Sequence, residues 1–256
     1  MIVIGVMGPS YCGSTVVGLS LGRIGGVVCA GEVHRLVTRE KWGGLRPSKS
    51  IPDGITERFK EPFPYWYRHL GGALGAWRAF VITDKVPSLY RLFSPPPDII
   101  VFPYKDPRSQ VASFIRHNPQ EERNLYSWIK HIVEVYQNCI HYTEYKKMPV
   151  VSLSMEDLAY HPRKTLKALA EALGLPYQNS MLHYWTDPPL TFGGNEQVNE
   201  WNHDVPTDEE WEKRFYRKFG RDDRWKTELS PAESSEVIGN NQIQEIQAWL
   251  LERKVS

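Results

Sequence analysis

The chain is poor in the residues that mark a disulfide scaffold, a structural metal site or a membrane protein. Its three cysteines, Cys12, Cys29 and Cys139, are far apart and form no C-x-x-C pair, which argues against a disulfide framework or a zinc site. The histidines show no H-E-x-x-H spacing. No apolar run reaches the ~18 residues of a membrane span, and the apolar start lacks a basic signal-peptide region. We therefore expect a cytoplasmic protein without a membrane partner or a bound metal.

An excess of charge of either sign is also missing. Lysine and arginine total 31 against 30 acidic residues, so the formal net charge is +1. Such a protein lacks the positive field expected of nucleic-acid binding, and any anion site must be local. The length of 256 residues favours one large domain, 1–256, over two small ones.

Short apolar runs alternate with helical patterns through the first two thirds of the chain. Strands are expected over Ile2–Met7, Val27–Ala30, Ala79–Thr83, Ile99–Tyr104 and Pro149–Leu153, and helices over Ser14–Ile24, Arg108–His117, Glu121–Lys146 and Pro162–Leu173. This order predicts an α/β fold: a doubly wound, mainly parallel sheet with helices on both faces. Two segments depart from the alternation: an aromatic and Pro-rich insertion at about 41–78, and a C-terminal helical segment at about 205–256 with an interruption near Gly239.

The first strand runs directly into Gly8–Thr15, which has the P-loop spacing G-x-x-x-x-G-x-[ST]. Backbone N–H groups of such a loop, at a helix N-terminus, bind phosphate or sulfate. Ser14 stands where a nucleotide triphosphatase has lysine, so the usual contact with a β,γ-phosphate pair is not expected. An ordinary helix entry through glycine is the alternative reading of this loop.

Polar residues also follow three other expected strands. Glu32 follows the second strand, Lys85 the third and Lys105 the fourth. Because ligands of parallel sheets bind at the carboxyl ends of the strands, we expect these side chains to converge with the loop on one site. Each also has a structural interpretation: Glu32 as a helix N-terminal residue, Lys85 as an ion-pair partner, and Lys105 as a surface charge.

Four blocks of the sequence resemble the PAPS-dependent sulfotransferases, where PAPS is 3′-phosphoadenosine 5′-phosphosulfate. Gly8–Thr15 resembles the 5′-phosphosulfate loop of that family, and Cys29–Glu32 resembles the Gly-Glu motif of its Golgi-type and bacterial branches. Tyr104–Ser113 resembles the 3′-phosphate block R-D-P-R-x-x-x-x-S, and Ser154–Leu175 resembles the Y-E-D-L…L-G-L segment. The third block is the most specific, because its basic residue, its D-P-R and its distal serine are all in register.

The resemblance implies a role for each residue of the site. The 5′-phosphosulfate would be held by Ser10, Tyr11, Cys12, Gly13, Ser14 and Thr15, and the 3′-phosphate by Lys105 and Ser113. Arg108 is within reach of the same phosphate, although the corresponding arginine is more often structural in the family. Glu32 is the expected general base, with His34 as the alternative, and Lys85 would stabilise charge on the sulfuryl group or the bridging oxygen.

The sequence departs from the family pattern at two positions. Tyr11 replaces the arginine of the 5′ loop, and Lys105 replaces an arginine, which keeps the charge but loses a bidentate contact. Two other functions therefore stay open. Phe80–Asp84 resembles a Walker B strand, which would suit a degenerate P-loop kinase or nucleotide triphosphatase. Loss of the loop arginine would suit a catalytically inactive relative that still binds PAP, the desulfated product of PAPS.

The predicted function is transfer of a sulfuryl group from PAPS to a hydroxyl or amine of a small-molecule acceptor, such as a specialised metabolite, releasing PAP without a metal. The aromatic residues of the 41–78 insertion suit an aromatic acceptor, whereas Asp53, Glu57 and Glu61 suit a cationic one. No nucleic-acid partner is expected. The oligomeric state stays open, and a homo-oligomer is compatible with the sequence.

Overall fold

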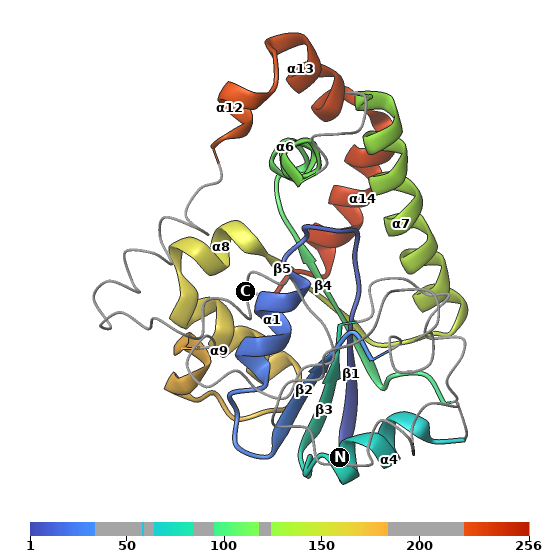
Figure 1. Cartoon of the computed structure of the whole chain (residues 1–256), viewed down its shortest axis with the longest axis vertical. Helices are drawn as coiled ribbons and strands as arrows, with labels where there is room; N and C mark the ends of the chain where they lie inside the picture. Colours follow the sequence, from blue (N-terminus) through green and yellow to red (C-terminus); the bar gives the residue numbers. More distant parts are fainter. Residues whose placement is uncertain (34–57, 59–63, 84–94, 118–123, 184–222, 256) are drawn as a thin grey trace.

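A computed structural model describes residues 1–33, 58, 64–83, 95–117, 124–183 and 223–255 of the chain. A parallel sheet lies at its centre, with helices packed on both sides (Figure 1). His34, Lys85 and most of the 41–78 insertion lie outside the described residues. No helix in the described ranges is long and apolar enough to cross a membrane.

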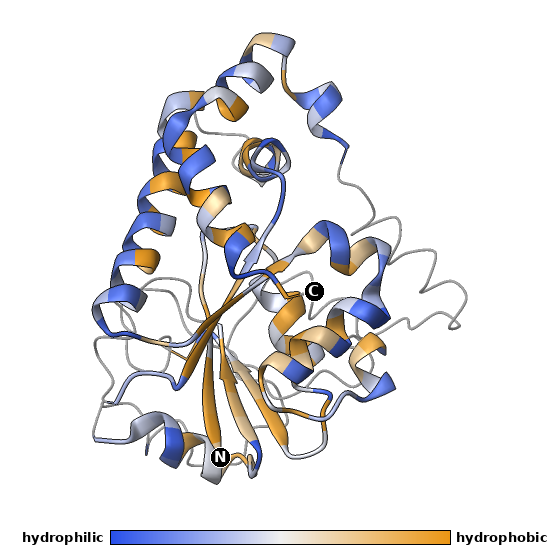
Figure 2. Cartoon of the chain, turned by 180° about the vertical axis from the view of Figure 1, so that it is seen from behind, coloured by the Kyte–Doolittle hydropathy of each residue, from blue (hydrophilic) through white to orange (hydrophobic). Residues whose placement is uncertain are grey.

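The sheet has five strands in the order β2-β3-β1-β4-β5, and every neighbouring pair is parallel. The strands are β1 (Ile2–Val6), β2 (Val27–Gly31), β3 (Ala79–Ile82), β4 (Ile99–Tyr104) and β5 (Val150–Ser154). Ile4 of β1 pairs with Val81 of β3 and Ile99 of β4. Figure 2 shows these strands as largely hydrophobic, as expected where both faces are covered. The predicted fold class and the five predicted strands are confirmed, with each end within one residue.

One face of the sheet is covered by α1 (Ser14–Leu21), α8 (Met155–Tyr160), α9 (Pro162–Ala172) and the short 3-10 helix η1 (Asn179–His183). The first helix is three residues shorter than predicted. It stops at Leu21 because Gly22 caps it, and the chain then makes two tighter turns, from Arg23 N to Ser20 O and from Ile24 N to Leu21 O. Helix α8 was not predicted, since its six residues are too few for a helical pattern.

The other face is covered by α4 (Trp66–Ala73), α6 (Pro107–His117), α7 (Leu125–Tyr145) and α14 (Asn241–Glu252). The prediction that α7 starts at Glu121 is wrong. The helix begins at Leu125 because the Asn124 side chain accepts a hydrogen bond of 2.9 Å from the Ser127 N–H, which satisfies one of the free donors of the first turn. Helix α4 was missed because its Gly71 and Gly72 and its aromatic residues read as insertion sequence.

The C-terminal region forms α12 (Trp225–Glu228), α13 (Pro231–Gly239) and α14. The predicted interruption near Gly239 is confirmed: Asn240 separates the last two helices and its side chain accepts from the Ile243 N–H. Beyond α14 the chain runs along the outer edge of β5, where Ser152 donates to Arg253 O at 2.8 Å and accepts from Val255 N at 3.0 Å. Lys254 pairs with Asp157 at 2.5 Å. The chain thereby covers a sheet edge that would otherwise expose unpaired backbone groups.

Candidate anion-binding site

The turn from β1 to α1 passes through three residues with positive φ angles before it enters the helix. Gly8, Tyr11 and Gly13 all have positive φ angles, of 149°, 65° and 102°. The N-cap of α1 is Gly13, which has no side chain to cap the helix, and the first turn of α1 contains no acidic residue. The positive end of the helix dipole and the first N–H groups therefore face the loop without a carboxylate from the helix's own first turn. The residues present fit a bound phosphate or sulfate group.

Gly13 is fixed by sterics as well as by its backbone angles. A Cβ atom at this position would lie 2.5 Å from Sδ of Met155, the first residue of α8, and its φ of 102° disfavours any side chain. The neighbouring Cys12 is fully buried, and its N–H donates to Pro9 O at 3.3 Å. The loop is thus packed closely on the elements beneath it.

The second part of the site lies where β4 ends and α6 begins. Lys105 Nζ donates to Ser113 Oγ at 2.9 Å, and Ser113 Oγ donates in turn to the backbone carbonyl of Ser109 at 2.9 Å. The resemblance assigns both side chains to one phosphate, and in the structure they contact each other. An ammonium and a hydroxyl held together at a helix N-terminus are chemically suited to a phosphate group.

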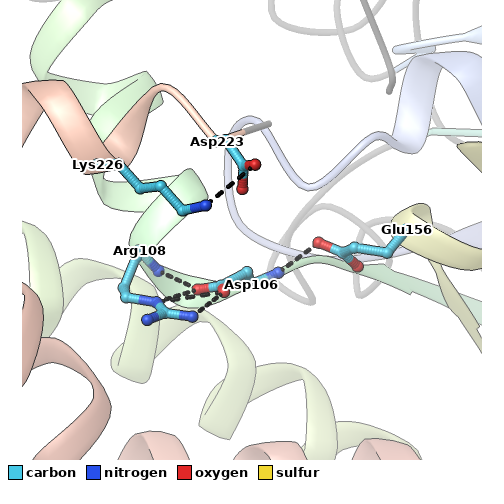
Figure 3. A network of polar contacts seen from close by, with 5 residues as sticks. All are labelled: Asp106, Arg108, Glu156, Asp223 and Lys226. Atoms are coloured by element: carbon cyan, nitrogen blue, oxygen red, sulfur yellow. Dashed lines mark hydrogen bonds and ion pairs between the residues drawn. The ribbon is translucent and has the colours of Figure 1, made fainter. Parts of the chain in front are cut away.

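Arg108 is held by other groups. Its guanidinium makes a bidentate pair with Asp106, with the shortest distance 2.5 Å, and lies 3.8 Å from the ring centroid of Trp225. Figure 3 shows the side chain folded back onto Asp106, below the Lys226–Asp223 pair at 3.2 Å. The hydrogen bond to Asp106 raises the pKa of Arg108. These contacts favour the structural role that the resemblance gave as the more common one.

Glu156 connects two of the blocks that resemble the family, Tyr104–Ser113 and Ser154–Leu175. Its carboxylate accepts from the Asp106 N–H at 2.8 Å (Figure 3). It also accepts from Ser154 Oγ at 3.0 Å. The neighbouring Asp157 pairs with Lys254. The contact of Glu156 with the β4–α6 turn spans 50 residues, so no local pattern could reveal it. It fixes the backbone immediately after Lys105.

Tyr104, the last residue of β4, stays uncharged beside this turn. Burial, with the nearby Asp157 and Glu156, raises the pKa of its hydroxyl to about 12. The hydroxyl is buried and has no hydrogen-bond partner in the structure as described. At neutral pH Tyr104 therefore adds no negative charge next to Lys105.

Two residues of α6 that the sequence analysis did not single out contact the loop. Gln110 Nε2 donates to the backbone carbonyl of Ser10 at 2.9 Å, and the ring of Phe114 meets the Tyr11 ring edge-on at a centroid distance of 5.0 Å. Gln110 falls at a variable position of the Tyr104–Ser113 block, and Phe114 lies directly after that block. The only signal in the sequence is their i, i+4 spacing, which places them on the same face of the helix.

Glu32 lies at the carboxyl edge of the same sheet, after β2. Gly31 has a φ of 72°, and its carbonyl accepts from the N–H groups of Val33 and Thr83. Glu32 itself is 7% exposed. The loop, Glu32 and Lys105 thus follow the carboxyl ends of β1, β2 and β4, as predicted. His34 and Lys85, the two other predicted catalytic residues, fall in the parts of the chain that are not described.

Comparison with known proteins identifies the fold. No family model matches this sequence, and no curated protein matches it significantly. The structure is similar to the sulfotransferase domain from the curacin biosynthetic pathway, with a TM-score of 0.64 and 18% sequence identity over 98% of this chain and 97% of that one. This chain has the sulfotransferase fold. The sulfotransferase domain of the Synechococcus PCC 7002 olefin synthase is also similar, with a TM-score of 0.62 and 16% identity over 97% of this chain and 94% of that one.

Proposed function

We propose that this protein is a sulfotransferase that moves a sulfuryl group from PAPS to a hydroxyl or amine of a small-molecule acceptor and releases PAP. The observation that carries the proposal is the 2.9 Å contact between Lys105 Nζ and Ser113 Oγ, beside the β1–α1 loop in a sulfotransferase fold. A ligand with a 3′-phosphate and a 5′ anionic group matches two such anion sites. ATP, which has no 3′-phosphate, would leave Lys105 and Ser113 without a ligand.

Each part of the site has a role in the proposed reaction. The amides of Gly13, Ser14 and Thr15 at the start of α1 would hold the 5′-phosphosulfate, and Lys105 with Ser113 would hold the 3′-phosphate. The acceptor oxygen or nitrogen attacks sulfur in line, the bond from sulfur to the 5′-phosphate oxygen breaks, and PAP leaves. Glu32 would take the proton from the acceptor. A sulfuryl group carries less charge than a phosphoryl group, so neutralisation by a metal is less pressing than in a kinase.

The first test is a thermal-shift titration with PAP, ADP and Mg-ATP. PAP at one hundred times its dissociation constant should stabilise the folded state by about 2.7 kcal/mol, which corresponds to roughly 5–10 °C for a domain of this size. ADP, which lacks the 3′-phosphate, should give a much smaller shift at the same concentration. An equal response to ADP, or a preference for Mg-ATP, would contradict the proposal and favour a kinase or nucleotide triphosphatase.

A further inference from the structure

Helix α6 holds the β1–α1 loop through a partly buried hydrogen bond. The Gln110 side chain is 1% exposed, and its Nε2 lies 2.9 Å from the backbone oxygen of Ser10, 100 residues away in the sequence. Because the acceptor is a carbonyl oxygen, only the amide nitrogen of Gln110 can make this bond. A buried amide is costly unless it is hydrogen-bonded, so the contact ties the position of the helix to the position of the loop.

The same helix face also holds the residue with the least favourable backbone angles in the loop. Tyr11 has a φ of 65°, a conformation that side chains other than glycine and asparagine seldom adopt. Gln110 fixes the carbonyl just before Tyr11, and Phe114, one turn further along α6, packs against the Tyr11 ring at an interplanar angle of 86°. The loop shape that presents its amides to an anion is therefore maintained in part from α6.

The cationic half of the site lies on the same two turns of helix. Ser109 and Ser113, which are 2% and 4% exposed, alternate with Gln110 and Phe114, and Ser113 contacts Lys105. This short, buried segment of α6 thus contacts the β1–α1 loop through Gln110 and Phe114, and it contacts Lys105 through Ser113. Any shift of this segment on binding an anion at Lys105 would be transmitted to Ser10 and Tyr11.

We infer that Gln110 is a positioning residue that couples the two anion sites, so that a 3′-phosphate at Lys105–Ser113 strengthens binding of the 5′ group in the loop. The inference rests on the proposed function, since it assumes a nucleotide with both groups. The coupling makes the protein selective for nucleotides that carry both phosphates on one ribose. Nucleotides with a single phosphate would use only half of the site and gain nothing from the coupling.

The test measures dissociation constants of 5′-AMP, 3′-AMP and PAP by titration calorimetry on the full chain. The gain from the 3′-phosphate is the ratio of the dissociation constant of 5′-AMP to that of PAP. In the Gln110→Met variant, which keeps the size of the side chain and loses its donor, the gain should fall roughly 5-fold or more. Binding of 3′-AMP should stay within a factor of about two of wild type, because Lys105 and Ser113 are unchanged.

Val111→Ala is the matched control. Val111 is fully buried in the same turn of α6 and its side chain has no polar atom that could donate to Ser10, so Val111→Ala should lower thermal stability and keep the gain. Phe114→Leu removes the ring contact with Tyr11 and should reduce the gain as Gln110→Met does. It provides the same test if the Gln110→Met variant fails to fold. If Gln110→Met and Phe114→Leu both keep the gain of the wild type, the coupling is contradicted and the proposed function is not affected. If the wild type itself shows a gain of one, both the coupling and the proposed function are contradicted.

Discussion

Replacement of Glu32 by glutamine should lower kcat by about 10²- to 10⁴-fold, the usual contribution of a general base. Glutamine keeps the size and the hydrogen-bonding capacity of a side chain that is 7% exposed, so the fold and the binding of PAP should persist. The variant lacks only a group that can accept the acceptor's proton. Steady-state turnover of PAPS with an acceptor found by screening, together with calorimetric titration of PAP, measures both effects.

The pH profile separates a base from a structural carboxylate. A general base must be deprotonated to act, so wild-type kcat should rise with pH through the pKa of that base, and the rise should be absent in Glu32→Gln. Glu171→Gln, the same change at an exposed position on α9, should leave both kcat and its pH profile unchanged. A Glu32→Gln variant with normal turnover would exclude Glu32 as the base. Equal loss of turnover and of PAP binding would instead indicate a structural role.

Replacement of Lys105 by methionine should weaken PAP binding by roughly 10- to 150-fold, since a hydrogen bond to a charged group contributes about 1.5–3 kcal/mol. The ammonium lies 2.9 Å from Ser113 Oγ, so the change removes the positive charge of the proposed 3′-phosphate site and keeps the aliphatic stem. Binding of 5′-AMP should change little, because it carries no 3′-phosphate. Calorimetric titrations of the two nucleotides measure the difference.

Lys167→Met is the matched control for Lys105. Lys167 lies on α9, on the opposite face of the sheet, where its ammonium is 3.9 Å from Glu171 and the side chain is 62% exposed. The change has the same effect on net charge, so it separates a local contact from a general electrostatic effect. If Lys105→Met weakens PAP and 5′-AMP by the same factor, Lys105 does not bind the 3′-phosphate and the assignment of that block is wrong.

The strands could be predicted from the sequence because each is largely buried and reads as a short, mostly apolar run, although β5 also contains Ser152 and Ser154. Ile99–Tyr104 was predicted with both ends correct. Helix ends depend on single capping contacts, which explains the errors at Gly22 and Asn124. Helix α8 is a short element whose start is fixed by the Ser154 side chain accepting from the Asp157 N–H. Such elements are stabilised by their tertiary setting more than by local preference.

The same distinction holds within the site. Lys105 and Ser113 are close in sequence, and the resemblance had already assigned both to one site before the structure showed their contact. Contacts that join distant segments were missed: Gln110 with Ser10 across 100 residues, and Glu156 with Asp106 across 50. In each of these a side chain meets a backbone atom, and a backbone atom leaves no signature in the residue type. The resemblance to a family indicated residues expected to bind a ligand and gave no information about those that hold them in place.

The buried thiol of Cys12 gives the anion-binding loop a chemical reporter of its own. The side chain is fully buried although its backbone forms part of the loop, so an alkylating reagent can reach it only when the loop opens. Cys29 is buried within β2, and burial raises the pKa of its thiol to about 12, which leaves it unreactive in the folded protein. Labelling at Cys12 ahead of Cys29 would therefore measure local opening of the loop, whereas labelling of both together would measure global unfolding.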